Sequence, residues 1–464
     1  MRRKRLALIV SPLLAAAFAL SACSGPAAPP TTAPATTEAS TAAPTSAAPA
    51  PVTLTFRTWD ENAAAAYKES FTAFTAANPD ITINTEVVPW SDYFTKLRTD
   101  VAGGSAADLF WLNNSYYLSY AQSGALVDIG SVFGGDPTSL KQTFAPSVVD
   151  QFTDAGKLWG VPQTSDGGIA VYYNKKLLDA AGLKVADISN LTWSPSGGDN
   201  TLLSVAQKLT KDKNGKTADQ AGFDAKNVVQ YGYNAAQDLQ AIYLNFIGSN
   251  GGTYQTPDGK FTLDNPKTIE AFAYIVDLIN KYHVAPSAAD TNTNGNFSID
   301  AFNQGKMALF QSGMYNLSNV ANNAKFEWGV VNLPKGPAGA VSVTNGVAVM
   351  GNAKSAHPEA VAKVLKWLGS ADGNKQIGAS GANLPGVIAA QQVYTDYWKG
   401  KNVDLTPFFD VIKNATPIPA PVGANFGAGY TAIATILNDV FLGRTPVADG
   451  MKKANDAGNA AIAG

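Results

Sequence analysis

The sequence predicts an α/β protein built from mostly parallel sheets that are flanked by helices. In residues 52–112, segments in which apolar side chains alternate come between segments in which they recur at helical spacing. This strand-helix-strand-helix-strand order is typical of a parallel sheet with helices on both faces. Residues 52–464 also form a chain that is long for one hydrophobic core, so we expect two or more lobes.

The first elements follow from local patterns. Residues 52–56 and 81–87 alternate as strands do, and residues 109–112 form a third, apolar strand. A helix that begins at Glu61 should end at Asn78-Pro79, because proline cannot continue a helix. A second helix, capped by Ser91 or Asp92, should end at the glycine pair 103–104.

Strands and helices continue to alternate along the rest of the chain, with no internal repeat. We expect a hairpin at residues 256–259 because Thr-Pro-Asp-Gly is a turn sequence. The other expected strands are 169–173, 229–233, 306–310 and 342–350, and the other expected helices are one stopped by Gly182 and those at 201–210, 237–247, 266–282, 357–368, 430–442 and 446–462.

The first 22 residues predict an export signal. Four basic residues precede an apolar run, 6–22, which is shorter than the ~20 residues that span a bilayer comfortably. Small residues before Cys23 resemble the bacterial lipoprotein box, in which the cysteine is diacylated and becomes the new N-terminus. The alternative is an uncleaved transmembrane anchor. Residues 24–51, rich in Ala, Pro and Thr, cannot bury enough apolar surface to fold, so we expect a flexible linker.

Composition and motifs argue against several functional classes. The formal net charge is −2, and past the signal no Lys/Arg-rich run indicates nucleic acid binding. Cys23 is the only cysteine and there are two histidines, so no cysteine metal cluster is available, and we expect no metal or other cofactor. The sequence lacks HExxH, GxSxG and P-loop motifs, which favours a protein that is not an enzyme.

Aromatic and polar residues recur where the first three strands end. In parallel α/β sheets, ligands bind outside the carboxyl ends of the strands. Here those ends carry the sequences Thr58-Trp59-Asp60, Pro89-Trp90-Ser91 and Trp111-Leu-Asn113-Asn114. Aromatic platforms beside groups that donate and accept hydrogen bonds suit a neutral polar ligand.

Several segments together resemble the sugar-type extracellular solute-binding proteins of ATP-driven importers. They occur in order behind the lipoprotein box and cover nearly the whole chain after the linker: Asn78-Pro-Asp-Ile81, Ala107-Asp-Leu-Phe-Trp111, Tyr120-Ala-Gln-Ser-Gly-Ala-Leu126, Leu158-Trp-Gly-Val-Pro162, Tyr172-Tyr-Asn-Lys-Lys-Leu-Leu-Asp-Ala-Ala-Gly182, Gly305-Lys-Met-Ala-Leu-Phe-Gln-Ser-Gly313, Thr344-Asn-Gly346, His357-Pro-Glu-Ala360 and Lys366-Trp-Leu368. The resemblance implies two α/β lobes, each with a mostly parallel sheet, joined by three hinge crossings. After the signal peptide (1–22) and the lipidated linker (23–51), the first lobe would hold 52–164 and 346–387, and the second 165–345 and 388–464. The crossings would lie near residues 163–166, 344–346 and 384–387.

The resemblance also implies where a sugar would bind. Trp59 and Asp60 stand at the first strand end, where the family places ligand contacts, although Trp59 could instead pack in the core. The remaining candidates are Trp90, Asn113, Asn114, Asp166, Tyr315 and Asn345. Asp166 could equally be an ordinary turn residue, and Asn345 could merely hold a turn. Maltose-binding relatives carry a charged Asp-Arg pair where this chain has Ser115-Tyr116, so maltose is not assumed as the ligand.

These features predict a lipoprotein that captures a carbohydrate between its lobes and delivers it to the permease of an ABC transporter. We expect it to be monomeric and held by lipid at the extracytoplasmic face of the cell membrane. The alternatives are an exported glycoside hydrolase, which needs two carboxylates roughly 5–9.5 Å apart, and a carbohydrate-binding surface protein with no role in transport. A surface adhesin with a sandwich fold disagrees with the helical periodicities.

Overall fold

The computed structural model describes residues 50–463 except 166, 415–417 and 419. Cys23, the expected signal peptide and the expected linker as far as residue 49 lie outside these residues. The first sheet has the order β2-β1-β3-β12-β6. Its strands are β1 (Val52–Thr58), β2 (Ile81–Val87), β3 (Leu109–Asn113), β6 (Val161–Thr164) and β12 (Val347–Gly351).

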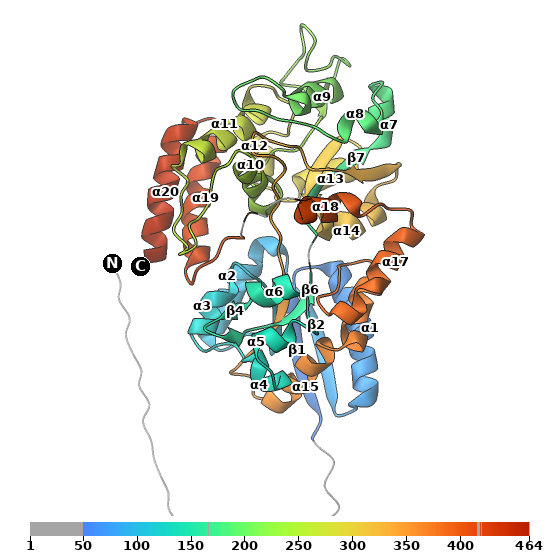
Figure 1. Cartoon of the computed structure of the whole chain (residues 1–464), viewed down its shortest axis with the longest axis vertical. Helices are drawn as coiled ribbons and strands as arrows, with labels where there is room; N and C mark the ends of the chain where they lie inside the picture. Colours follow the sequence, from blue (N-terminus) through green and yellow to red (C-terminus); the bar gives the residue numbers. More distant parts are fainter. Residues whose placement is uncertain (1–49, 166, 415–417, 419, 464) are drawn as a thin grey trace, which may run out of the picture. The chain divides into compact units, whose positions relative to one another are not determined.

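Four strands of the first sheet run in one direction. β1 is parallel to β2 and β3, and β12 is antiparallel to both β3 and β6. The intervening helices are α1 (Glu61–Ala77) and α2 (Trp90–Gly103), as the β-α-β-α-β pattern predicts. The predicted cap of α2 is wrong, because the helix begins at Trp90 with Pro89 before it and no side-chain cap. Figure 1 shows this sheet together with α1 and α15 (Pro358–Leu368).

The second sheet differs from the expectation of mostly parallel strands. Its order is β10-β7-β11, and the central strand β7 (Ile169–Asn174) is antiparallel to β10 (Leu309–Gly313) and to β11 (Trp328–Val331). The two outer strands are therefore parallel to each other, and α14 (Leu317–Asn323) lies between them in the chain. Apolar strands that are buried on both faces look alike in sequence whichever way they run, so the pattern could not reveal this direction.

Several helices and strands begin or end at other residues than predicted, because contacts with distant segments decide these boundaries. The strand expected at 306–310 begins at Leu309, and the preceding Met307 forms a single bridge with Tyr231. The strand expected at 342–350 begins at Val347, while Val343 bridges Ile418. The helix expected at 237–247 divides into a π-helical turn, η1 (Leu239–Tyr243), and α10 (Leu244–Ser249).

The remaining elements of the described residues are four strands of two or three residues and further helices of varied length. The strands are β4 (Thr153–Asp154), β5 (Lys157–Leu158), β8 (Lys211–Asp212) and β9 (Val228–Gln230). The helices are α3 (Tyr117–Gln122), α4 (Ile129–Phe133), α5 (Pro137–Leu140), α6 (Pro146–Gln151), α7 (Lys175–Ala180), α8 (Val185–Ile188), α9 (Thr201–Leu209), α11 (Pro266–Asn280), α12 (Ala288–Thr291), α13 (Phe297–Asn303), η2 (Met314–Asn316), α16 (Ala371–Ala379), η3 (Ile388–Ala390), α17 (Gln392–Gly400), α18 (Thr406–Asn414), α19 (Phe426–Phe441) and α20 (Val447–Ala463).

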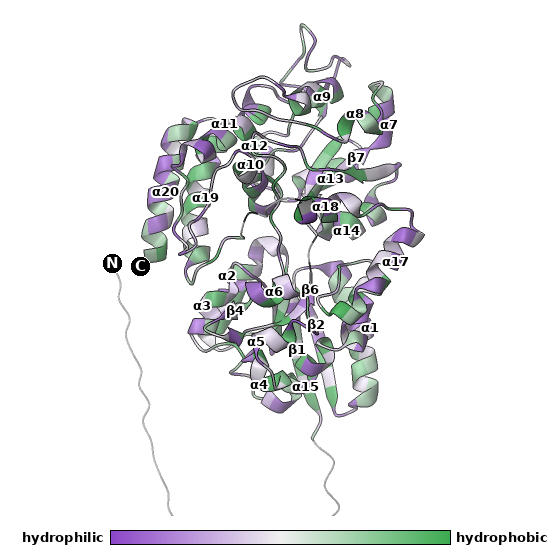
Figure 2. Cartoon of the chain, in the orientation of Figure 1, coloured by the Kyte–Doolittle hydropathy of each residue, from purple (hydrophilic) through white to green (hydrophobic). Residues whose placement is uncertain are grey.

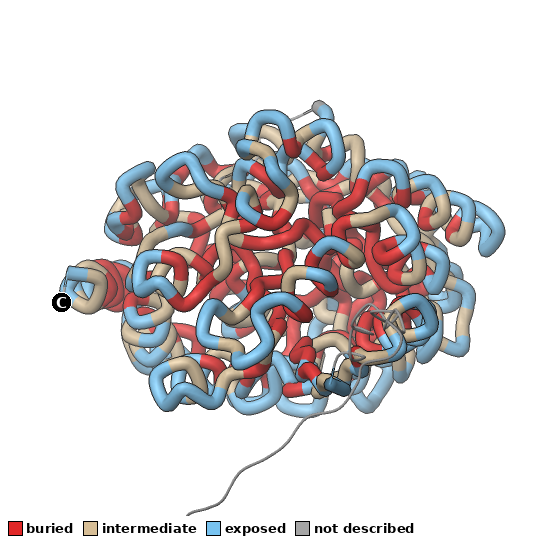
Figure 3. The backbone as a smooth tube through the Cα atoms, turned by 90° about the horizontal axis from the view of Figure 1, so that it is seen from below, coloured by how far each residue is buried: buried red, intermediate tan, exposed pale blue. Residues whose placement is uncertain are grey.

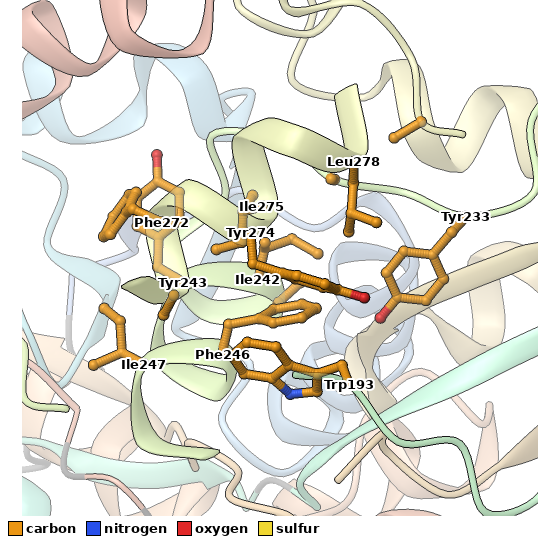
Figure 4. Close-up of a cluster of buried hydrophobic side chains, with 14 of the residues drawn as sticks. Trp193, Tyr233, Ile242, Tyr243, Phe246, Ile247, Phe272, Tyr274, Ile275 and Leu278 are labelled. Carbon is orange, nitrogen blue, oxygen red and sulfur yellow. The ribbon is translucent and has the colours of Figure 1, made fainter. Parts of the chain in front are cut away.

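Each sheet has its own buried apolar cluster. In one cluster, side chains of the first sheet such as Phe56 pack with Phe71 of α1 and Val364 of α15. The largest cluster lies beside the second sheet and gathers side chains from η1, α10 and α11, including Tyr243 and Phe272, together with Trp193 from the segment before α9 (Figure 4). Surface helices such as α20 carry hydrophilic residues beside hydrophobic ones (Figure 2), and buried segments lie inside a shell of exposed ones (Figure 3). None of the described helices is both long and apolar enough to span a membrane.

The chain passes between the sheets at the positions expected for hinge crossings. β6 of the first sheet ends at Thr164 and β7 of the second begins at Ile169. The chain returns through residues 344–346 into β12, and Pro385 forms a bridge with Thr164. Beyond them, Tyr394 and Trp398 of α17 pack with Tyr172 of the second sheet. The expected two-lobed α/β fold is thus confirmed, while the residue limits of the lobes stay a prediction.

Candidate functional site

One edge of the first sheet gathers most of the predicted site residues. Because β12 is antiparallel to its neighbours, its first residue meets the last residues of β3 and β6, and Val347 pairs with Asn113 and Thr164. The ends of β2 and β1 lie at the same edge, since Thr58 pairs with Val87. In strand order, the edge therefore carries Trp90, Trp59 with Asp60, Asn113 with Asn114, and Asn345.

Trp59 is the centre of an aromatic cluster at this edge. Its ring meets Trp90, Tyr93 and Trp111 edge to face, with centroids 5.1, 4.9 and 5.0 Å apart. Trp59 is partly buried and Trp111 is buried, whereas Trp90 is 46% exposed. Edge-to-face packing fixes an aromatic ring while leaving part of its surface free. The cluster thus contains both packed rings and an exposed rim, and ligand contact by Trp59 and Trp90 stays a prediction.

Asp60 has a structural role in the fold. Its Oδ1 accepts hydrogen bonds from the backbone N–H groups of Asn62 and Ala63 at 2.8 and 3.0 Å, which caps α1. Its Oδ2 accepts a hydrogen bond from Asn383 Nδ2 at 3.3 Å. Burial raises the pKa of the Asp60 carboxyl above its ordinary value, although these donors oppose the rise. The carboxylate joins the first helix to the residue that precedes the third crossing.

Polar side chains collect where the chain leaves β3 and where it enters β12. Asn113 is buried, and its Oδ1 accepts a hydrogen bond from the Ser115 backbone N–H at 3.2 Å. Asn114 Oδ1, Ser115 Oγ and Asn345 Nδ2 are buried and have no hydrogen-bond partner among the described residues. Buried polar atoms are nearly always paired in native proteins. These three atoms lie at the predicted edge of the first sheet, and contact of Asn113, Asn114 and Asn345 with a ligand stays a prediction.

Asp166 and Tyr315 are the candidates that do not belong to the edge of the first sheet. Asp166 lies outside the described residues. Tyr315 follows β10, whose last residue, Gly313, pairs with Ile169 at the beginning of β7. A Cβ at Gly313 would lie 2.0 Å from the Tyr315 ring, so glycine is needed for that ring to fold back over the strand. Tyr315 packs against the largest apolar cluster, and its contact with a ligand stays a prediction.

The sequence did not identify the residues of the π-helical turn η1. Asp238 caps this turn by accepting hydrogen bonds from Gln240 and Ala241 backbone N–H groups at 3.0 and 2.8 Å. Gln240 Nε2 donates to Asn345 Oδ1 at 3.2 Å, which connects the turn to the second crossing. Burial raises the pKa of the Asp238 carboxyl, yet the residue retains an exposed surface.

An aromatic contact also connects the first sheet to the C-terminal helices. Tyr116 stacks on Phe94 with ring centroids 3.9 Å apart, and meets Phe426 of α19 edge to face at 5.5 Å. Phe426 stacks in turn on Tyr430 at 5.7 Å. The hydroxyl oxygens of Tyr243 and Tyr254 are buried without a partner among the described residues. The only sequence signal for this group was the departure Ser115-Tyr116.

Other features do not coincide with the candidate edge. A cavity of about 540 Å³ opens between α9 and α11, and Asp199, Tyr274 and Lys281 are among its lining residues. None of the predicted site residues lines it. Within the described part of the chain, no three His, Cys, Asp or Glu side chains are grouped so that they could hold a metal ion.

Comparisons with known proteins agree with the fold. A sequence model of the bacterial extracellular solute-binding protein family matches residues 58–375. A putative binding protein of Brucella abortus is 26% identical over 399 residues, which cover 85% of this chain and 89% of the relative. The crystal structure of Mycobacterium tuberculosis UspC is 54% identical, covers 88% of this chain and 100% of its own, and superposes with a TM-score of 0.68.

A more distant structure shares the fold. An ABC substrate-binding protein from Listeria monocytogenes in complex with cycloalternan has 23% identity, covers 89% of this chain and 99% of its own, and superposes with a TM-score of 0.74. The family match extends over more than half of the chain and includes every candidate at the edge of the first sheet. This protein therefore belongs to the bacterial extracellular solute-binding proteins.

Proposed function

We propose that this protein is the substrate-binding component of an ABC importer and binds a mono- or oligosaccharide between its two sheets. The observation that carries the proposal is the sheet edge that holds both Trp59 and Trp90 and buried amide and hydroxyl atoms with no partner among the described residues. Aromatic faces stack on apolar sugar faces, and side chains that donate and accept hydrogen bonds match the hydroxyls. Relatives named for sugars support a carbohydrate, among them a lactose-binding protein of Rhizobium radiobacter and a maltodextrin-binding protein of Bacillus subtilis.

The first-lobe contacts would come from Trp59, Asp60, Trp90, Asn113 and Asn114. Asp166, Tyr315 and Asn345 would contribute from the crossings and the second sheet. A sugar that contacts both lobes stabilises the closed arrangement by its differential affinity for it. The closed protein would then present surfaces of both lobes to the permease. Binding in this scheme involves no chemical turnover.

We further propose that the protein acts as a monomeric lipoprotein at the extracytoplasmic face of the cell membrane. Residues 1–22 would be the signal peptide, and Cys23 would carry the acyl chains, palmitate among them. Two acyl chains hold a protein at a membrane far better than one, because each buried methylene contributes about 0.8 kcal/mol. Residues 24–51 would space the lobes, 52–164 with 346–387 and 165–345 with 388–464, away from the membrane.

A thermal-shift screen tests the carbohydrate proposal. The panel contains lactose, maltotriose, mannotriose, acarbose and tagatose, and each mixture is also assayed for sugar products. A ligand at 100 times its Kd stabilises a protein by about 2.7 kcal/mol, so a binder gives a clear rise in Tm. A rise without new products supports a receptor, whereas cleavage of an oligosaccharide would identify a glycoside hydrolase. If no carbohydrate in a wider panel raises Tm, the proposed ligand class is wrong.

A further inference from the structure

A chain of buried hydrogen bonds begins beneath the aromatic cluster. The indole Nε1 of Trp111 donates to the Tyr67 hydroxyl at 3.0 Å, and that hydroxyl donates to Gln163 Oε1 at 2.9 Å. Trp111 and Tyr67 are each 1% exposed, and Gln163 is completely buried. Trp111 in turn supports Trp59 edge to face at 5.0 Å. The Trp59 ring that we propose as a sugar platform is thus linked to Gln163 by one ring contact and two hydrogen bonds.

Gln163 then connects two crossings to each other. It lies at the end of β6, and its backbone oxygen accepts a hydrogen bond from Gly386 N–H at 2.9 Å. Asn374 Nδ2 donates to both oxygens of Gln163, at 3.1 and 3.2 Å, and Asn374 Oδ1 accepts from the Val387 N–H at 3.0 Å. Gln163 Nε2 donates to Leu368 O at 3.1 Å. The first and third crossings are therefore fixed to each other and to α15 and α16 through two buried amides.

This polar network lies within the apolar core of the first sheet. Buried polar networks in which the members are paired make the surrounding core rigid and specify one geometry. Gly386 approaches the chain at Pro162 so closely that a Cβ would lie 2.6 Å from the Pro162 carbonyl carbon. The first and third crossings thus pack directly against each other, and hydrogen bonds connect them to Trp111.

We infer that Gln163 and Tyr67 are positioning residues that couple the aromatic platform to the hinge. They hold the first and third crossings in a fixed relation to Trp111 and Trp59. A ligand that binds at the platform therefore changes the free energy of rotation at the crossings, and rotation changes the affinity for the ligand. This inference rests on the proposed function of ligand-driven closure. A coupling claim requires an element with two arrangements that both sites bias, and the joined crossings are that element.

The test compares two variants of the network with a matched control. Gln163→Leu removes the side-chain hydrogen bonds while keeping the volume similar, and Tyr67→Phe removes only the hydroxyl that joins Gln163 to Trp111. Ser70→Ala is the control, because Ser70 lies on α1 near Tyr67, is 1% exposed and joins Trp367 Nε1 to Gly373 O at 3.0 and 2.7 Å. It therefore disturbs the same helix without touching a crossing.

The measurements are Tm, Kd for the sugar of the panel with the largest thermal shift, and the distance between spin labels on the two lobes. The full chain carries Cys23→Ala, with labels at the exposed positions Thr95 of α2 and Asp300 of α13. Network variants should broaden or shift the distance distribution of the ligand-free protein and change Kd about tenfold, a typical size for coupling between sites. Ser70→Ala should lower Tm while leaving Kd and the distances unchanged.

The inference is overturned if both network variants keep the distances and Kd of the starting protein. It is equally overturned if Ser70→Ala changes them as much, because the effect would then be general destabilisation. If the starting protein binds no carbohydrate, the proposed function fails, and the ligand-free distance distributions still decide whether Gln163 and Tyr67 set the arrangement of the lobes.

Discussion

The amide of Asn383 donates a hydrogen bond to the carboxyl group of Asp60 at 3.3 Å, and so connects the third crossing to the N-terminus of α1. Replacing Asp60 by alanine removes this bond and the cap of α1, and should cost about 1 kcal/mol of unfolding free energy. Asp60→Asn can still cap the helix and should lose much less. Urea denaturation of the two variants measures the difference, and equal losses would contradict a capping role.

The same carboxyl group predicts a pH dependence. Its folded pKa is raised by burial, so between the ordinary pKa of about 3.9 and the folded value the folded state binds more protons than the unfolded state. Stability from this group therefore falls as pH rises through that window and stays constant above it. Relative to wild type, Asp60→Asn should gain stability from pH 4 to pH 7. Tm at both pH values tests the sign, and a constant difference would be the contrary result.

Replacing Asn114 or Asn345 should weaken ligand binding while leaving the stability of the fold nearly unchanged. Each carries a buried polar atom without a partner among the described residues, so replacing it by alanine abandons few hydrogen bonds within the protein. We expect Kd for the panel sugar to rise about tenfold, which is 1.4 kcal/mol, with only small changes in Tm. Thr85→Val is the control, because Thr85 Oγ1 is also buried and unpartnered but lies within β2. A Kd that stays at the wild-type value in both asparagine variants would move the site elsewhere.

Trp90 should be the aromatic residue whose loss affects the ligand more than the fold. It is 46% exposed, whereas Trp111 is 1% exposed. Trp90→Ala should weaken sugar binding by about 1 kcal/mol, the scale of one aromatic contact, and should lower Tm slightly. Calorimetric titration measures the first effect. If the Kd of Trp90→Ala equals that of the wild type, the ligand does not contact Trp90 and binds at other residues of the first-sheet edge.

Asp100 should make the first lobe sensitive to acid. Although burial opposes the change, hydrogen bonds from Lys96 and Arg57 hold the pKa of its carboxyl below the ordinary value. The 2.6 Å ion pair with the buried Arg57 therefore contributes stability that is present above pH 4 and lost as pH falls further. Asp100→Asn should cost about 2 kcal/mol at neutral pH and flatten the acid side of the stability profile. A variant with the wild-type profile would contradict this.

The sequence predicted the first three strands of the first sheet well because their signals are local. Alternation at 52–56 and 81–87 and the stop at Asn78-Pro79 require no knowledge of distant residues. The direction of β7 and the π-helical turn η1 depend on partners far along the chain, and no local pattern encodes them. The contact between Tyr116 and Phe426 joins segments more than 300 residues apart. Strand ends therefore indicated most residues of the candidate edge, whereas the turn η1 and the contact of Tyr116 with Phe426 required the structure.

The placement of β12 has a consequence for how the molecule forms. This strand lies between β3 and β6, yet it is synthesised only after β7, β10 and β11 of the other sheet. Until residues 347–351 arrive, β3 and β6 have no common neighbour, and the early chain cannot complete its sheet. Pairings between distant segments form slowly. Such an order of assembly delays a stable fold until most of the chain exists, which suits a polypeptide that has to be threaded through a membrane before it folds.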